Sequence, residues 1–169
     1  MALQEVARSS EIEKLKAATV SSRLALGLLL LIGLGLRFAV IGGEVESLVR
    51  VMPDDAYYYL GVARHVAAGA GSTFDGAHVT NGYHPLWLLS LLPLTGLDSL
   101  TLARAALTLG ALFSLGSALI LHRLLRRASA SDWLAACGAG VYFIWPPTVL
   151  NSLNGLETSL TTLLFAAAC

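Results

Sequence analysis

The sequence has few charged residues: they make up 13% of its 169 residues, against about a quarter in ordinary soluble domains. Hydrophobic residues account for 56%, and the mean hydropathy is +0.70. Acidic and basic residues balance at 11 each. No basic face with interleaved aromatic residues is present, which argues against a nucleic-acid partner. The composition is typical of a membrane protein.

Cysteine is also scarce, with only Cys137 and Cys169, both inside apolar segments. This number excludes a disulfide framework and metal-type cysteine spacing. We expect both side chains to behave as small buried hydrophobes. The sequence also lacks a Gly-rich phosphate loop, a nucleophile elbow and a Ser-His-Asp order. We therefore expect no nucleotide cofactor.

Long apolar runs predict an all-α, multi-pass membrane protein with a helical external loop after the first span. We divide the chain into a cytoplasmic polar lead (1–23), a first transmembrane helix (24–41), an external loop (42–85) and further transmembrane helices (86–169). In the lead, Ser9 and Ser10 are candidate caps of a short helix through Lys16. Four bases and three acids precede the first span, and two bases and five acids follow it. This weak bias places the N-terminus in the cytoplasm.

The topology after the loop is open between two arrangements. The apolar stretch 86–97 is too short for a standard span, whereas 100–121 and 133–150 are long enough. If 86–97 crosses the bilayer, the Arg123, Arg126 and Arg127 cluster lies outside, against the charge rule. If it dips into the membrane or lies along it, the cluster is cytoplasmic and Glu157 returns to the side of Asp54 and Asp55, the arrangement that charge bias favours. The last apolar run stops at Cys169, so we expect an N-terminal fragment of a longer protein.

The adjacent carboxylates Asp54 and Asp55 are the first candidates for chemistry. A carboxylate beside a membrane can take a proton from an attacking hydroxyl, and two together can hold a divalent cation. The alternative is that one caps the helix predicted over 55–68, which Gly69 and Gly71 end, while the other is solvated. The setting of the pair, just outside a span and at the start of a tyrosine-rich helix, favours chemistry.

Three further residues have both a functional and a structural interpretation. His84, whose backbone Pro85 restrains, is a candidate for metal or phosphate contact or a hydrogen-bonded structural residue. Glu157 is a candidate site residue or the N3 residue of a helix capped by Asn154. Arg37, near the outer end of the first span, either neutralises a phosphate or extends to the lipid headgroups.

Aromatic residues concentrate around the acidic pair, where they could form a sugar-binding platform or anchor the loop at the membrane interface. They are Tyr57, Tyr58, Tyr59, Tyr83 and Trp87. Among them Tyr58 is our candidate for substrate contact, and Arg64 on the same predicted helix is a candidate source of positive charge.

The segments Asp54–Leu60, Thr73–Gly76 and Thr80–Trp87 together resemble the N-terminal part of bacterial GT-C-fold membrane glycosyltransferases. These are relatives of the protein O-mannosyltransferases and the lipid A aminoarabinose transferases. Here the pair is Asp-Asp where several members have Asp-Glu, and Leu86 stands where the family's His-Pro-Pro corner has its second proline.

The resemblance implies transfer of a sugar from a polyprenyl-phosphate donor to a lipid, glycan or protein acceptor at the outer face of the bacterial inner membrane. Asp54 or Asp55 would be the general base, and Asp55 and His84 the candidate ligands of a divalent metal ion. Arg37, Tyr58, Arg64, His84 and Glu157 would contact substrate. We expect the fragment to be inactive alone. The rival interpretation is a non-enzymatic membrane protein, either a transporter subunit or a lipid-binding scaffold.

Overall fold

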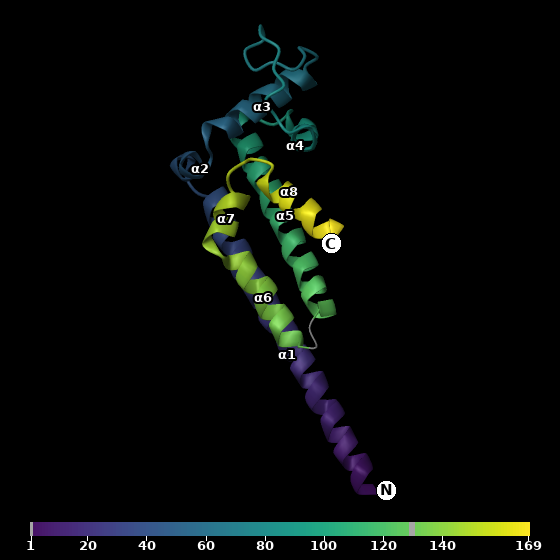
Figure 1. Ribbon diagram of the computed structural model, residues 1–169. Helices are drawn as coiled ribbons and strands as arrows, with labels where there is room; N and C mark the ends of the chain where they lie inside the picture. The colour runs from purple at the N-terminus through teal and green to yellow at the C-terminus, as the bar shows by residue number, and fades with distance from the viewer. Residues whose placement is uncertain (1, 129–130) are drawn as a thin grey trace.

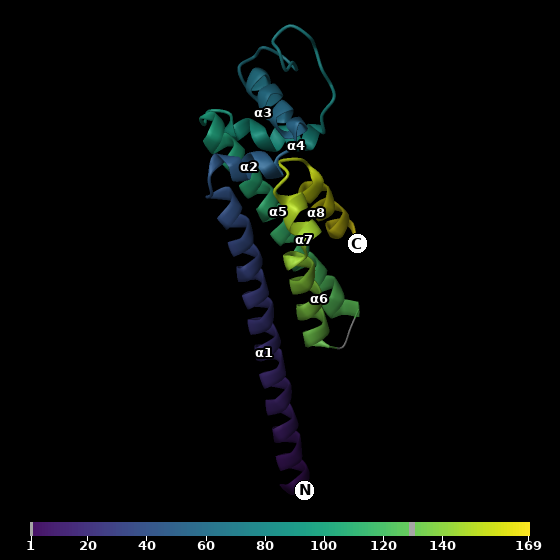
Figure 2. The same ribbon diagram turned by 90° about the vertical axis from the view of Figure 1, so that its left-hand side faces the viewer.

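The computed structural model describes residues 2–128 and 131–169. In these ranges the regular secondary structure is helical, apart from one isolated bridge between Thr73 and Val79. Three helices form the long body of the molecule: α1 (Ala2–Ile41), α5 (Ser99–Ala128) and α6 (Asp132–Ile144). In both ribbon views α1 extends well beyond the others toward the N-terminus (Figures 1 and 2).

The polar lead and the first apolar run form one continuous helix of 40 residues. The predicted helix start at Ser9 and Ser10 is therefore wrong, because the chain is already helical from Ala2. Within α1 the part long and apolar enough to cross a membrane is Lys16–Ile41, and α5 is the second such helix among the described residues. These two candidate spans agree with the membrane class predicted from composition.

The apolar segment predicted as a span over 133–150 is broken into two helices. It consists of α6 and α7 (Pro146–Ser152), whose axes are bent by 56°. The break falls at Trp145, which is followed by two prolines. Proline cannot donate a helical hydrogen bond and its ring clashes with the preceding turn. The pair therefore turns at Trp145, and α7 then leads into the final helix, α8 (Thr158–Ala168).

The short elements gather at the end of the body opposite the N-terminus (Figure 1). They are α2 (Val45–Val51), α3 (Asp54–Ala67), α4 (Pro85–Leu91) and a 3-10 turn (Leu92–Leu94). The predicted helix 55–68 is thus confirmed within one residue. The apolar stretch after His84 is too short to cross a membrane by itself. Because α6 runs antiparallel to α5 (Figure 2), Glu157 returns to the end that holds α3.

One core joins this end to the body. Its fully buried members include Trp87 and Leu91 from α4 and Leu102 and Leu107 from α5. The indole Nε1 of Trp87 donates to the carbonyl of Gly155, 3.1 Å away. The loop before α8 is therefore anchored to α4, which makes Trp87 a packing residue and removes it from the candidate sugar platform.

Arg37 is fully buried, so it neither extends to the headgroups nor faces solvent. Its guanidinium donates to Ser152, Ser114 and the carbonyls of Gly33 and Phe143. It also lies 4.0 Å above the centre of the Phe143 ring. Arg37 thus joins α1 to α5, α6 and α7, and its predicted contact with substrate is not what this geometry provides.

Both cysteines are exposed, contrary to the expectation of buried side chains. Cys137 lies on α6 beside Ala136, which is buried against α1. A helix in a membrane can present apolar side chains to lipid, so an apolar sequence context does not predict burial within the protein. The same reason explains the exposed leucines of α1, such as Leu24 and Leu31.

Candidate functional site

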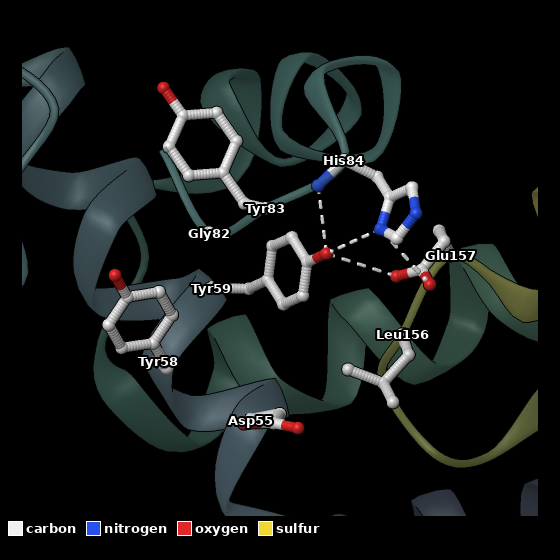
Figure 3. A pocket seen from close by; sticks show the side chains of 8 residues that line it. All are labelled: Asp55, Tyr58, Tyr59, Gly82, Tyr83, His84, Leu156 and Glu157. Atoms are coloured by element: carbon white, nitrogen blue, oxygen red, sulfur yellow. Dashed lines mark hydrogen bonds and ion pairs between the residues drawn. The ribbon is translucent and has the colours of Figure 1, made fainter. Parts of the chain in front are cut away.

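A pocket of about 300 Å³ opens where α3, the start of α4 and the loop before α8 meet. Its lining combines two carboxylates, three tyrosines and a histidine (Figure 3). The lining residues are Asp55, Tyr58, Tyr59, Gly82, Tyr83, His84, Leu156 and Glu157. Of the predicted site residues, the structure therefore brings together Asp55, Tyr58, His84 and Glu157.

The two adjacent aspartates at the start of α3 differ in their position relative to the pocket. Pro53 is the N-cap in extended backbone, and Asp54 and Asp55 occupy the first helical turn. Neither aspartate is thus the N-cap residue that the alternative interpretation required. The Asp54 carboxylate accepts a hydrogen bond from the main-chain N–H of Asp55, at 3.1 Å. Asp55 lines the pocket and Asp54 does not, so only one acid of the pair can act there.

Tyr59 is the centre of the hydrogen-bond network in the pocket. Its hydroxyl accepts from the main-chain N–H of His84 at 2.8 Å and donates to Glu157 at 3.2 Å. The same oxygen lies 2.9 Å from Nδ1 of His84, which is 3.1 Å from the other Glu157 oxygen. Burial, followed by the nearby carboxylates, raises the pKa of the Tyr59 phenol. Three separate segments are therefore tied together by one neutral hydroxyl.

Glu157 reaches the pocket because of the turn that precedes α8. Asn154 accepts from the main-chain N–H of Leu156 and donates to Thr158. Gly155 adopts a positive φ of +70°, which favours glycine. Glu157 is the residue immediately before the helix, and its side chain makes no capping hydrogen bond. The predicted capping role at N3 is thus wrong, since the carboxylate faces Tyr59 instead.

The polar loop after α3 supports one wall of the pocket. Tyr58 stacks on Phe74, with ring centres 5.1 Å apart, and its hydroxyl contacts that of Thr80. Ser72 donates to the Tyr83 hydroxyl at 2.7 Å. Figure 3 shows the Tyr58 and Tyr83 rings on the same side of Tyr59, with the His84 ring on the other. These rings and the acidic groups together line the pocket.

Two of the predicted cations lie elsewhere. Arg64 donates to Ser99 and to the carbonyl of Leu97, at 3.0 and 2.8 Å. It lines a separate cavity with Tyr57 on another face of α3. Arg37 is buried in the helical body, as described above. Neither guanidinium therefore reaches the pocket that contains Asp55.

The predicted metal ligands Asp55 and His84 both line this pocket. In residues 2–128 and 131–169 no group of three or more His, Cys, Asp and Glu side chains is placed to hold an ion. Nδ1 of His84 is already within hydrogen-bond distance of Tyr59 and Glu157. The predicted pair of ligands, Asp55 and His84, is also short of the six or more oxygens that calcium takes.

The sequence interpretation gave no individual role to Tyr59, although a signal for it existed. Helical neighbours are three or four residues apart, which places Tyr59 above Asp55 on one face of α3. The buried residues of this helix include Ala56, Tyr59 and Ala63.

Comparisons with known protein families, with curated proteins and with solved structures found no match to this chain.

Proposed function

We propose that this protein is a multi-pass membrane glycosyltransferase of the GT-C type, with the pocket around Asp55 as its reaction site. The observation that carries the proposal is the position of the pocket, at one end of a body that contains two helices apolar enough to span a membrane. A lipid-borne sugar would reach such a site from the bilayer, while a polar acceptor would reach it from water.

The chemistry needed is modest because a polyprenyl-phosphate sugar carries its own leaving group. The acceptor oxygen attacks the anomeric carbon, the bond from that carbon to the phosphate oxygen breaks, and the electron pair leaves with the phosphate. The proton of the acceptor hydroxyl passes to a carboxylate. Asp55 suits this role, since it lines the pocket and its carboxylate has no hydrogen-bond partner among the described residues.

The proposed setting is the bacterial inner membrane, with the N-terminus in the cytoplasm and the pocket at the outer face. The Arg123, Arg126 and Arg127 cluster near the opposite end of α5 supports this orientation, because basic residues are enriched on the cytoplasmic side. Arg126 also forms an ion pair with Asp132 at the start of α6.

The test is sugar transfer from a polyprenyl-phosphate donor by the full-length protein reconstituted in lipid vesicles. Asp55→Asn is expected to lower the transfer rate by roughly 10²–10⁴-fold, the usual contribution of a general base. Asp54→Asn is the matched control and should retain transfer, because its carboxylate does not line the pocket. Equal activity of the two variants and the parent would contradict the proposal and favour a lipid-binding scaffold or a transporter subunit.

A further inference from the structure

The hydrogen bonds around His84 determine which of its ring nitrogens carries the hydrogen. The single hydroxyl hydrogen of Tyr59 is donated to Glu157. The Tyr59 oxygen must therefore act as an acceptor toward Nδ1 of His84, 2.9 Å away. A phenol oxygen has two lone pairs, and the second accepts the main-chain N–H of His84. This arrangement requires a hydrogen on Nδ1.

Glu157 imposes the same requirement independently. Its second oxygen lies 3.1 Å from Nδ1, and an ionised carboxylate can only accept. With the hydrogen on Nε2 instead, the Nδ1 lone pair would face the carboxylate oxygen without a proton between them. Both neighbours of Nδ1 thus favour the same tautomer, in which Nε2 of the neutral ring keeps a free lone pair.

Nε2 is accessible to a ligand. The His84 side chain is 66% exposed, whereas that of Glu157 is 22% exposed. Figure 3 shows the second ring nitrogen on the side of the ring away from Tyr59. The lining of the pocket therefore includes two acceptors, the Asp55 carboxylate and the Nε2 lone pair, the latter on the side of Tyr59 opposite the Tyr58 and Tyr83 rings (Figure 3).

The charges of the lining determine what such a pocket can bind. Asp55 and Glu157 contribute two carboxylates, and no lysine or arginine of the described chain lines the pocket. A phosphate group would meet negative charge and hydrogen-bond acceptors, both unfavourable for it. A hydroxyl-rich neutral ring would instead donate to the acceptors and pack against the tyrosine faces.

We propose that Tyr59 and Glu157 hold His84 in its Nδ1–H form, so that Nε2 accepts a hydrogen bond from a hydroxyl of a neutral sugar bound in this pocket. The inference rests on the proposed function, because it assigns the pocket to the hydroxyl-bearing substrate. The phosphate of the lipid donor then lies outside it. His84 is a binding residue here, and Tyr59 and Glu157 are positioning residues.

The first arm of the test observes the tautomer directly, by ¹⁵N NMR of histidine-labelled full chain in detergent micelles at a pH where His84 is neutral. Nδ1 should resonate as a protonated nitrogen and Nε2 as an unprotonated one. Glu157→Gln, whose amide can donate to Nδ1, should shift the population toward the Nε2–H form. His78→Asn, in the loop outside the pocket, should leave the His84 signals unchanged. A parent protein with the Nε2–H form, or a tautomer ratio that Glu157→Gln leaves unchanged, would overturn the inference.

The second arm measures binding of methyl glycosides of common hexoses, with glucose 1-phosphate as the anionic counterpart, by saturation-transfer NMR. The neutral glycosides should bind, and His84→Phe should weaken their Kd by roughly tenfold, the value of one net hydrogen bond. His78→Asn should not change it. Absence of glycoside binding, or stronger His84-dependent binding of glucose 1-phosphate, would overturn the inference. Neither arm uses sugar transfer, so loss of the proposed activity would be recognised separately in the Asp55→Asn comparison.

Discussion

The guanidinium Nε of Arg37 donates to the hydroxyl of Ser152 at 2.8 Å, across 115 residues of sequence. A charged side chain is therefore buried among the helices and satisfied by neutral acceptors. Ser152 ends α7, five residues before Glu157. The contact couples the position of α1 to the turn that delivers Glu157 to the pocket.

Removing this contact should destabilise the helical body. Arg37→Leu leaves two buried hydroxyls and two carbonyls without their donor, and each such loss costs ~1–3 kcal/mol. We expect a thermal midpoint in detergent several degrees lower than that of the parent. Arg50→Leu is the control, because Arg50 is exposed on α2. Equal midpoints for the two variants would contradict the assigned role of Arg37.

The hydrogen bonds of the Tyr59 hydroxyl should persist to a higher pH than those of a phenol with an ordinary pKa. Burial raises the pKa of Tyr59 in the folded state. A raised folded-state pKa means a contribution to stability that is complete below the unfolded value near 10 and is lost as pH rises through the folded one. In Tyr59→Phe this loss should be absent, whereas Tyr58→Phe should retain it. Tyrosine ¹³Cζ titration by NMR, with chemical unfolding at each pH, measures both effects.

The loop between α3 and α4 should be most ordered in mildly acidic solution. The hydrogen bond from His78 holds the pKa of Asp75 well below its usual range, and Asp75 raises the pKa of His78. The Asp75 contribution is present above about pH 4 and lost below it. That of His78 is present below about pH 6.5 and lost as pH rises through its raised value. Amide hydrogen exchange at Ala77 and His78, corrected for the intrinsic rate, should therefore be slowest between these limits.

This loop prediction has a direct control. In His78→Asn the exchange rates at Ala77 should lose the high-pH change but keep the low-pH one, because the Asp75 carboxylate still accepts the Ala77 N–H. A parent protein whose corrected rates do not vary between about pH 3 and pH 8, a range that spans both unperturbed pKa values, would contradict the role of the pair.

Gly155 is expected to be the most sensitive glycine of the site. Its φ is +70°, and an added Cβ would lie 3.0 Å from Ala56 and 3.1 Å from Met52. Gly155→Ala combines left-handed strain of ~1–2 kcal/mol with crowding against α3. Gly76→Ala, at φ +78° with open space around it, isolates the strain. The thermal midpoint should fall more for Gly155→Ala, and equal falls would exclude a packing role.

The sequence predicted what depends on local pattern. The helical pattern and the glycines that end it predicted α3 within one residue. The length of the apolar runs predicted that α1 and α5 would contain helices long enough to cross a membrane. The pocket could be predicted only in part, because Tyr59 and Glu157 are 98 residues apart. Which helices become neighbours depends on packing between distant segments. For that reason Arg37 and Arg64 were assigned to a site from which the structure separates them.

The break at Trp145 and the continuous α1 illustrate a second limit. Proline signals a helix boundary but not the angle that follows, here 56°. Serine residues such as Ser9 signal a cap, yet they also occur inside helices when other residues sustain the pattern. Local signals of this kind indicate alternatives, and tertiary packing selects among them.

The central claim is that the pocket lies at the outer membrane face, where lipid-borne sugars are used. The most direct test is single-cysteine labelling of intact cells with a membrane-impermeant maleimide, after replacing the exposed Cys137 and Cys169 with serine. A cysteine introduced in place of His78 should be labelled without permeabilisation, and one in place of Arg127 only after it. Labelling of position 127 but not 78 in intact cells would contradict the account.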